Sequence, residues 1–277
     1  MKYDNIIYRP PSEANTLLLQ VTSGCSHNKC SYCSMYRDIP FKTESLEQIE
    51  KDLIKAKVFH KNTKRIYLLN GDPFTLNADK LKSIAQLIHT HLPNCETISM
   101  YSSIKSIKNK SLQELKELRS LGINDLYIGI ETGCDESLEY INKGNNSREA
   151  IKELKRLNDA SIDFISIIMY GIAGYDKGVE NAIATAKLLN SVRSKAIALM
   201  NLTLIPGTEL YEETIKGNFV QASEQEKLIE IKTLIEHFHL KDETLFSSIH
   251  ISNLAPLNGI LPRDKELFID RLNRVIV

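Results

Sequence analysis

Six short apolar runs alternate with amphipathic segments over the first 205 residues, and this alternation constrains the fold more than any other feature. The runs lie at residues 16–21, 65–69, 96–101, 125–130, 164–170 and 196–205. The segments between them carry apolar residues at helical spacing, as Leu46, Ile49 and Leu53 do after Ser45. Strands this apolar, separated by helices, indicate an α/β fold with a parallel sheet covered by helices.

Capping signals mark where several helices should begin. Ser45 with Gln48, Ser111 with Glu114 and Ser223 with Glu226 have the spacing of a capping box. The region after residue 220 breaks the alternation, with one helix after Ser223 and another near residues 267–272. We expect an N-terminal extension at 1–14, a main domain at 15–220 and a C-terminal appendage or lid at 221–277.

Polar or glycine-bearing segments follow each of the six runs. In a parallel sheet or barrel these segments meet at the carboxyl ends of the strands, where active sites form. We therefore expect one site that draws on several loops. The segments contain Cys25–Cys33, Asn70–Pro73, Tyr101–Ser103, Glu131–Gly133, Gly171–Gly174 and Pro206–Thr208.

Three of the five cysteines, Cys25, Cys30 and Cys33, lie within nine residues. In a reducing compartment such a cluster indicates metal binding rather than a disulfide framework. Three thiolates suit an iron–sulfur cluster with one open iron, or a zinc ion with His27 as a fourth ligand. Three unrelated reduced cysteines are the remaining alternative. Cys95 and Cys134 read as small buried apolar side chains.

Composition argues against several classes of partner. Lys plus Arg and Asp plus Glu both number 35, so the formal net charge is zero and offers little general attraction for nucleic acid. No apolar run approaches the roughly 18 residues of a membrane span. The N-terminal residues lack the pattern of a secretory signal. We expect a cytoplasmic protein with no membrane partner.

These motifs together resemble the radical S-adenosylmethionine (SAM) superfamily, over about residues 15–215. The family carries three cysteines, with three and two residues between them, after the first strand of a partial (β/α)6 barrel. Here four residues separate Cys25 from Cys30, and the second spacing is the usual one. The stretch from Glu131 to Gly144 is similar to the coproporphyrinogen dehydrogenase and methylthiotransferase branch. The resemblance implies a partial (β/α)6 TIM-like barrel with a short helical C-terminal appendage.

The resemblance also implies roles for particular residues. Cys25, Cys30 and Cys33 would hold a [4Fe–4S] cluster, and Tyr32 would lie near the adenine of SAM. The segment Asn70-Gly71-Asp72 matches the motif that holds the amino group of SAM. Further residues assigned to cofactor binding are Glu131 for the ribose, Lys143 for the carboxylate, Gly171 and Gly174 for adenine, and Ser102 at the same rim. Solvated strand ends and tight turns are the structural alternatives for these positions.

The chemistry implied is reductive cleavage of SAM to methionine and a 5′-deoxyadenosyl radical, which takes hydrogen from a substrate. A reductant such as flavodoxin or ferredoxin would supply the electron, and a small-molecule substrate is favoured over RNA. His250 is a candidate proton donor or substrate contact. The stiff segment from Arg9 to Glu13 could close the barrel or contact substrate. A non-catalytic haem or cluster carrier, with His27 and His250 as haem ligands, and a zinc-stabilised barrel are the alternatives.

Overall fold

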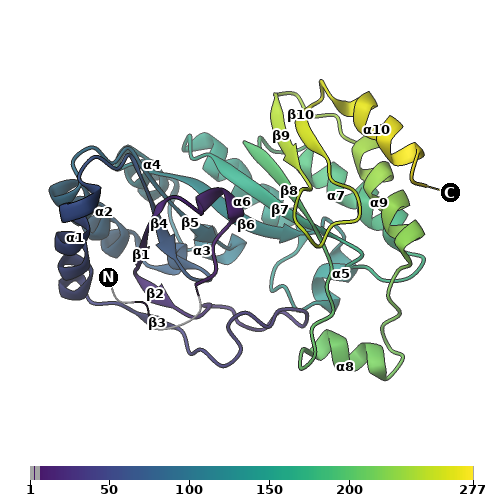
Figure 1. The fold of residues 1–277 in the computed structure, drawn as a ribbon, viewed down its shortest axis with the longest axis horizontal. Helices are drawn as coiled ribbons and strands as arrows, with labels where there is room; N and C mark the ends of the chain where they lie inside the picture. The colour runs from purple at the N-terminus through teal and green to yellow at the C-terminus, as the bar shows by residue number, and fades with distance from the viewer. Residues whose placement is uncertain (1–2, 4–6, 277) are drawn as a thin grey trace. The chain divides into compact units, whose positions relative to one another are not determined.

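The computed structural model describes residue 3 and residues 7–276, so part of the predicted extension at 1–14 lies outside the described residues. The chain divides into two compact units. The first contains Met1–Asn28, Met35–Ile128 and Arg156–Phe164, and the second contains Lys29–Ser34, Gly129–Lys155 and Ile165–Val277. Each unit is built from strands and helices that alternate along the chain (Figure 1).

The first unit has four parallel strands in the order β1-β4-β5-β6. Their bounds are Leu17–Gln20, Arg65–Leu69, Thr97–Ser102 and Ile123–Glu131, the last strand running on into the second unit. These agree with the first four predicted runs to within a few residues. A short antiparallel pair, β2 (Thr22–Ser23) with β3 (Lys42–Thr43), was not predicted because each strand has only two residues.

The helices of the first unit begin largely where the capping signals predict. They are α1 (Leu46–His60), α2 (Ala78–His91), α3 (Ile104–Lys108) and α4 (Leu112–Ser120), with the short 3₁₀ turns η1 (Pro11–Glu13) and η2 (Pro73–Thr75). Ser111 and Glu114 form the reciprocal capping box. Ser45 caps α1 through Gln48 N, but the Gln48 side chain bonds to Asp52 instead. Helices α1 and α2 pack side by side (Figure 1).

The second unit contains strands in the order β7-β8-β9-β10. Strands β7 (Phe164–Tyr170), β8 (Ala196–Asn201) and β9 (Thr244–Ser247) are parallel, and β10 (Asn258–Leu261) is antiparallel to β9. Its helices are α5 (Asp135–Tyr140), α7 (Gly178–Leu189), α8 (Glu209–Ile215), α9 (Glu224–Glu236) and α10 (Lys265–Asn273). Helix α6 (Ser147–Asp159) runs from the second unit into the first.

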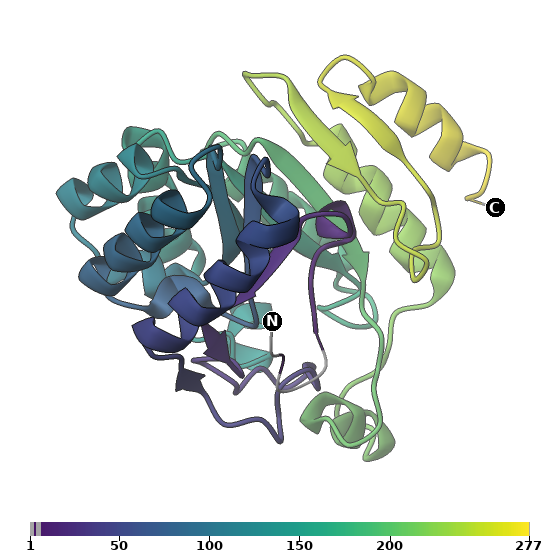
Figure 2. The same ribbon diagram turned by 60° about the vertical axis from the view of Figure 1, so that its left-hand side comes forward.

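The C-terminal segment contributes more than the two helices that the sequence predicts. Strands β9 and β10 extend the second unit's sheet beyond β8 (Figure 2). They were missed because each is short and mixes apolar residues with polar residues or glycine, and β9 leaves Leu245 exposed while it buries Phe246. Strand β8 ends at Asn201, four residues before the predicted end. The fold class is confirmed: the protein is a mixed α/β fold whose strands are mostly parallel.

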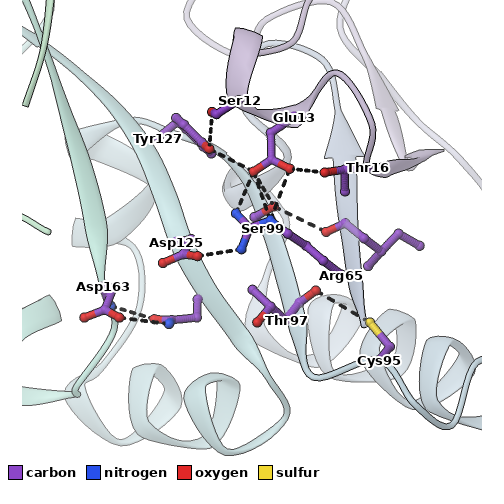
Figure 3. A network of polar contacts seen from close by, with 12 residues as sticks. Ser12, Glu13, Thr16, Arg65, Cys95, Thr97, Ser99, Asp125, Tyr127 and Asp163 are labelled. Carbon is purple, nitrogen blue, oxygen red and sulfur yellow. Dashed lines mark hydrogen bonds and ion pairs between the residues drawn. The ribbon is translucent and has the colours of Figure 1, made fainter. Parts of the chain in front are cut away.

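A buried ion-pair network lies at the start of the first unit's strands (Figure 3). Glu13, which is 1% exposed, accepts from the Arg65 guanidinium at 2.6 Å, from Tyr127 Oη at 2.8 Å and from Thr16 Oγ1 at 2.6 Å. Arg65 also donates to Asp125. These contacts attach Glu13, the end of the Arg9–Glu13 segment, to strands of the first unit, and the role of this segment in closing the barrel or contacting substrate stays a prediction. Among the described residues, no helix is long and apolar enough to cross a membrane.

Candidate active site

Asp72 is the most enclosed of the predicted cofactor-binding side chains, with 1% of its surface exposed. It follows β4 in the Asn70–Pro73 segment, and its Oδ2 accepts from Ser26 Oγ and Ser103 Oγ, both at 2.8 Å. Its Oδ1 is buried and has no partner among the described residues. Burial raises the pKa of Asp72, although the hydroxyls of Ser103 and Ser26 act in the opposite direction. A buried carboxylate oxygen without a donor is costly, so this site is suited to a ligand that brings one.

Lys110 is a buried cation that interacts electrostatically with this carboxylate. Lys110 is 3% exposed and donates from Nζ to the carbonyl oxygens of Phe74 at 2.6 Å and Ser106 at 3.2 Å. Burial lowers the pKa of Lys110 to about 8, whereas the charge of Asp72 raises it. The positive charge of Lys110 therefore offsets the negative charge of Asp72, while its ammonium group donates hydrogen bonds to backbone carbonyls.

The two residues before Asp72 shape the backbone rather than face an open space. Asn70 has a φ of 82° and donates from Nδ2 to the carbonyl of Thr22 at 2.5 Å. A Cβ at Gly71 would lie 2.8 Å from Cys25 Cβ and 2.9 Å from the Tyr36 ring. Glycine at this position lets the strand end approach the first cysteine closely. The predicted contacts of Asn70 and Gly71 with SAM remain predictions.

Ser102 is buried but does not touch Asp72. Its Oγ lies 3.1 Å from Ser106 Oγ, while the neighbouring Ser103 supplies the hydrogen bond to the carboxylate. Ser26, Ser103 and Ser106 were not predicted as site residues. The sequence signal that could have identified Ser103 is Ser106, three residues later, because these two serines form the capping box at the start of α3.

Glu131, Tyr32 and Lys143 come together in the second unit. Glu131 ends β6 with a φ of 64° and is 5% exposed, and its Oε1 accepts from Lys143 Nζ at 2.7 Å. Burial raises the pKa of Tyr32 well above its usual value, and the neighbouring Glu131, Cys30 and Cys33 add to this effect. The tyrosine therefore stays protonated and hydrogen-bonds to Glu131. These three predicted residues form one polar group.

Glycine at 129 makes room for the ion pair between Glu131 and Lys143. A Cβ at this position would overlap with Glu131 Oε1 and come within 3.1 Å of Lys143 Nζ. The Gly-Ile-Glu sequence at the end of β6 is thus explained by packing. Gly129 was not predicted as a site residue, although it lies two positions before the predicted glutamate.

The Cys30–Cys33 segment is held by backbone bonds on both sides. Ser31 N donates to the Ile141 carbonyl, and the Ser31 carbonyl accepts from Leu210 N, both at 2.9 Å. The Tyr32 ring packs against an apolar cluster in the same unit, formed by Ile141, Ile172, Leu202, Leu210 and Phe219. This packing explains why an aromatic residue stands between the last two cysteines.

All three cysteines of the motif are half-buried thiols that are not part of a disulfide bond. A turn closes between the last two, with Cys33 N donating to the Cys30 carbonyl at 3.1 Å. Cys25 belongs to the first unit, and Cys30 and Cys33 belong to the second. No group of three metal-ligating side chains is found among the described residues. Half-buried thiols fit a soft metal centre, and the three-cysteine ligand set remains a prediction.

Gly171 and Gly174 both have positive φ, at 77° and 83°. Gly171 N donates to Glu230 Oε2 at 2.8 Å, and a Cβ at Gly174 would lie 2.8 Å from the Val220 carbonyl. These contacts account for both glycines as turn residues, so their predicted contact with adenine remains a prediction.

His250, Cys95 and Cys134 lie apart from these groups. His250 is exposed, and its Nδ1 lies 2.8 Å from Ser252 Oγ, two residues on. Its predicted catalytic role remains a prediction. Cys95 is buried as expected, whereas Cys134 is half-buried at the start of α5.

The comparisons place the chain in a family. The family model described as the radical SAM superfamily matches residues 19–189, more than half of the chain. The chain therefore belongs to the radical SAM superfamily. The family and its solved structures bind a [4Fe–4S] cluster and S-adenosylmethionine. The predicted cofactors are therefore confirmed for the family to which the chain belongs.

Two curated relatives show about a quarter identity. Heme chaperone HemW of Bacillus subtilis is 26% identical over 200 residues, which cover 70% of this chain and 52% of that protein. An uncharacterized protein of Methanocaldococcus jannaschii is 25% identical over 225 residues, covering 77% of this chain and 69% of that protein. The chain thus spans about half the length of the HemW relative.

Two solved structures share the fold. Coproporphyrinogen III oxidase (HemN) from Escherichia coli, a radical SAM enzyme, gives a TM-score of 0.59 at 16% identity, covering 80% of this chain and 51% of that one. Methylornithine synthase (PylB) gives a TM-score of 0.55 at 16% identity, covering 94% and 81%. At this identity the likeness shows the shared fold alone.

Proposed function

We propose that this protein is a radical SAM enzyme with one [4Fe–4S] cluster on Cys25, Cys30 and Cys33. When bound and reduced, the cluster would supply the electron that cleaves SAM to methionine and a 5′-deoxyadenosyl radical. That radical would abstract hydrogen from a small-molecule substrate, with flavodoxin or ferredoxin as the class of reductant. The family match and the motifs support this proposal.

The observation that carries it is the unpartnered oxygen of Asp72. Ser26 and Ser103 hold Oδ2, and Oδ1 is left as a buried acceptor. An ammonium group is the donor that best matches an ionised carboxylate in a buried setting. The amino group of SAM is such a donor, and Asp72 stands in the motif that binds it in the family.

The polar group in the second unit has the chemistry to bind the rest of the nucleoside. The Glu131 carboxylate has two oxygens that can accept from the two ribose hydroxyls. Lys143 is a cation next to Glu131, and its charge suits the carboxylate of SAM. In the structure its Nζ pairs with Glu131 Oε1 at 2.7 Å. Ligand binding would therefore exchange part of this ion pair for ligand contacts.

The test is anaerobic reconstitution with iron and sulfide, then reduction in the presence of SAM and chromatography for 5′-deoxyadenosine. We expect the wild-type protein to produce it and Cys30→Ala to lose both cluster and product. Cys134→Ala is the matched control, because this half-buried thiol lies outside the motif. A wild-type protein that builds no cluster would contradict the proposal.

The likeness to the heme chaperone HemW of Bacillus subtilis favours a second candidate, a haem-binding carrier. His27 and His250 are the candidate haem ligands, and His250 is exposed. Haem added to the protein would then give a Soret band that shifts in His27→Ala or His250→Ala. A band that is the same in both variants as in wild type would argue against these ligands.

A further inference from the structure

Glu230 is a buried carboxylate on α9, outside every motif considered above. It is 2% exposed, and both of its oxygens are engaged. Oε2 accepts from the backbone N–H of Gly171 at 2.8 Å, and Oε1 accepts from Asn181 Nδ2 on α7 at 2.8 Å. One side chain of α9 thus holds the glycine turn after β7 and the helix that follows it.

Asn181 carries the same network to the end of β6. Its Oδ1 accepts from Thr132 Oγ1 at 2.6 Å, and Thr132 directly follows Glu131. One turn later on α7, Thr185 Oγ1 accepts from Gly133 N at 2.9 Å. The turn after β6 and the turn after β7 are therefore joined through buried hydrogen bonds to α7 and α9, all within the second unit.

Close packing shows that this arrangement leaves little freedom. A Cβ at Gly133 would overlap with the Ala184 carbonyl, and one at Gly178 would lie 3.1 Å from Glu230 Oε2. On the other side of the glycine turn, Lys227 Cε would lie 2.7 Å from a Cβ at Gly171. Both turns are thus seated directly on the helices that carry the network.

The surroundings of Glu230 leave little room for a ligand beside its carboxylate. The cavity beside it holds about 10 Å³, roughly the room for a single water molecule. Burial raises the pKa of Glu230 to about 7, while the hydrogen bonds from Gly171 and Asn181 and the charge of Lys227 lower it. A carboxylate placed in such a setting acts through the groups that it holds.

We propose that Glu230 and Asn181 are positioning residues for SAM, which hold the Glu131 and Gly171 turns in the conformation that binds it. This inference rests on the proposed function, because Glu131 and Gly171 are its predicted contacts for the ribose and adenine. A glycine turn with positive φ has many conformations open to it. Ordering both turns before the ligand arrives lowers the entropy lost on binding.

The experiment compares Glu230→Gln, Glu230→Ala and Asn181→Ala with wild type, all reconstituted with the cluster. Glu236→Gln is the matched control, since Glu236 is exposed on the same helix and its carboxylate pairs with Lys232 at 3.7 Å. The first measurement is KM for SAM and kcat for 5′-deoxyadenosine. We expect KM to rise about tenfold in Glu230→Ala, less in Glu230→Gln, with kcat at saturating SAM nearly unchanged.

The second measurement needs no cofactor. Native-state hydrogen exchange in the metal-free protein should show faster exchange at Gly171 and around Thr132–Cys134 in Glu230→Ala, with amides of β4 unchanged. Asn181→Ala should affect mainly the Thr132–Cys134 turn, because it leaves the Glu230 bond to Gly171 in place. Glu230→Gln retains an acceptor and should fall between wild type and Glu230→Ala.

The outcomes separate the inference from the proposed function. A lower kcat with unchanged KM in the variants would mean that they only reduce the folded fraction, and would overturn the positioning role. Faster exchange at the turns with unchanged KM would overturn it as well. If the wild-type protein neither binds nor cleaves SAM, the proposed function fails first, and the inference fails with it.

Discussion

The buried carboxylate of Glu13 and the half-buried guanidinium of Arg65 form a salt bridge of 2.6 Å between residues 52 positions apart. Glu13 ends the short turn η1, and Arg65 is the first residue of β4. The same guanidinium reaches Asp125 on β6 (Figure 3). The N-terminal segment is therefore fastened to two strands of the first unit by one arginine.

Glu13→Gln should destabilise the protein by about 1–3 kcal/mol at pH 7, because it leaves the half-buried Arg65 short of one charged partner. The hydrogen bonds from Arg65, Thr16 and Tyr127 lower the pKa of Glu13 despite its burial. Its contribution is therefore present above the pKa of the unfolded chain, near 4.5, and is lost as pH falls through the lower folded pKa. Urea denaturation from pH 7 to pH 3 measures both effects.

The control for this variant is Glu96→Gln, which breaks the exposed Lys64–Glu96 pair of the same unit. We expect a change below about 1 kcal/mol there. Equal losses in the two variants would contradict the structural role assigned to Glu13.

Asp72→Asn should weaken the binding of SAM without lowering the stability of the protein. The variant removes a buried carboxylate oxygen that has no partner, so its Tm should stay the same or rise. KM for SAM should increase by about tenfold or more, because the charged acceptor for the amino group is gone. Calorimetry of the metal-free protein and SAM kinetics of the reconstituted protein give the two values. A large fall in Tm would show that the carboxylate is mainly structural.

The pH dependence of the metal-free protein should also report on Asp72. Burial raises the pKa of this group, so its protonated form is the one that folding favours. Its contribution to stability is present below the unfolded pKa and is lost as pH rises through the folded pKa. We expect the difference in free energy of unfolding between wild type and Asp72→Asn to grow as pH rises through the folded pKa of Asp72. A difference independent of pH would contradict the assignment.

Gly129→Ala should weaken SAM binding although the residue at position 129 does not itself contact SAM. The added methyl group would overlap with Glu131 Oε1 and crowd Lys143 Nζ, so it should displace both side chains. We expect KM for SAM to rise about tenfold with the cluster still present. Gly217→Ala is the control, because a Cβ there meets open space and the cost is confined to its positive φ. Similar KM values in the two variants would argue against Glu131 as a ribose contact.

Removing the metal should leave the fold in place. The core of each unit is made of apolar side chains that are buried without any metal, such as Leu68 and Met100 in the first and Phe246 and Phe268 in the second. Chelation should therefore abolish SAM cleavage while the far-ultraviolet circular dichroism is retained. Loss of secondary structure would instead favour a zinc-stabilised barrel, in which metal binding and folding are coupled. Metal analysis should find about four iron atoms per chain in the loaded protein.

The periodic part of the fold was predictable. The runs at 65–69 and 164–170 match β4 and β7 residue for residue, because an apolar strand between capped helices has a strong local signal. The capping boxes at Ser111 and Ser223 are formed as predicted. The short strands β2, β3, β9 and β10 were not predicted, because they combine a length of two to four residues with polar residues or glycine, whereas β1, also of four residues, begins with three leucines.

The sequence by itself determined the α/β class, the cysteine motif and the segments that carry the candidate site. Each of these depends on residues that are neighbours along the chain. Only the tertiary structure decided which side chains satisfy one another: Ser26 and Ser103 on Asp72, Gly129 beside the Glu131–Lys143 pair, and Glu230 on Gly171, 59 residues away. The reason is physical, since a buried hydrogen-bonding group must find a partner wherever the packed chain brings one.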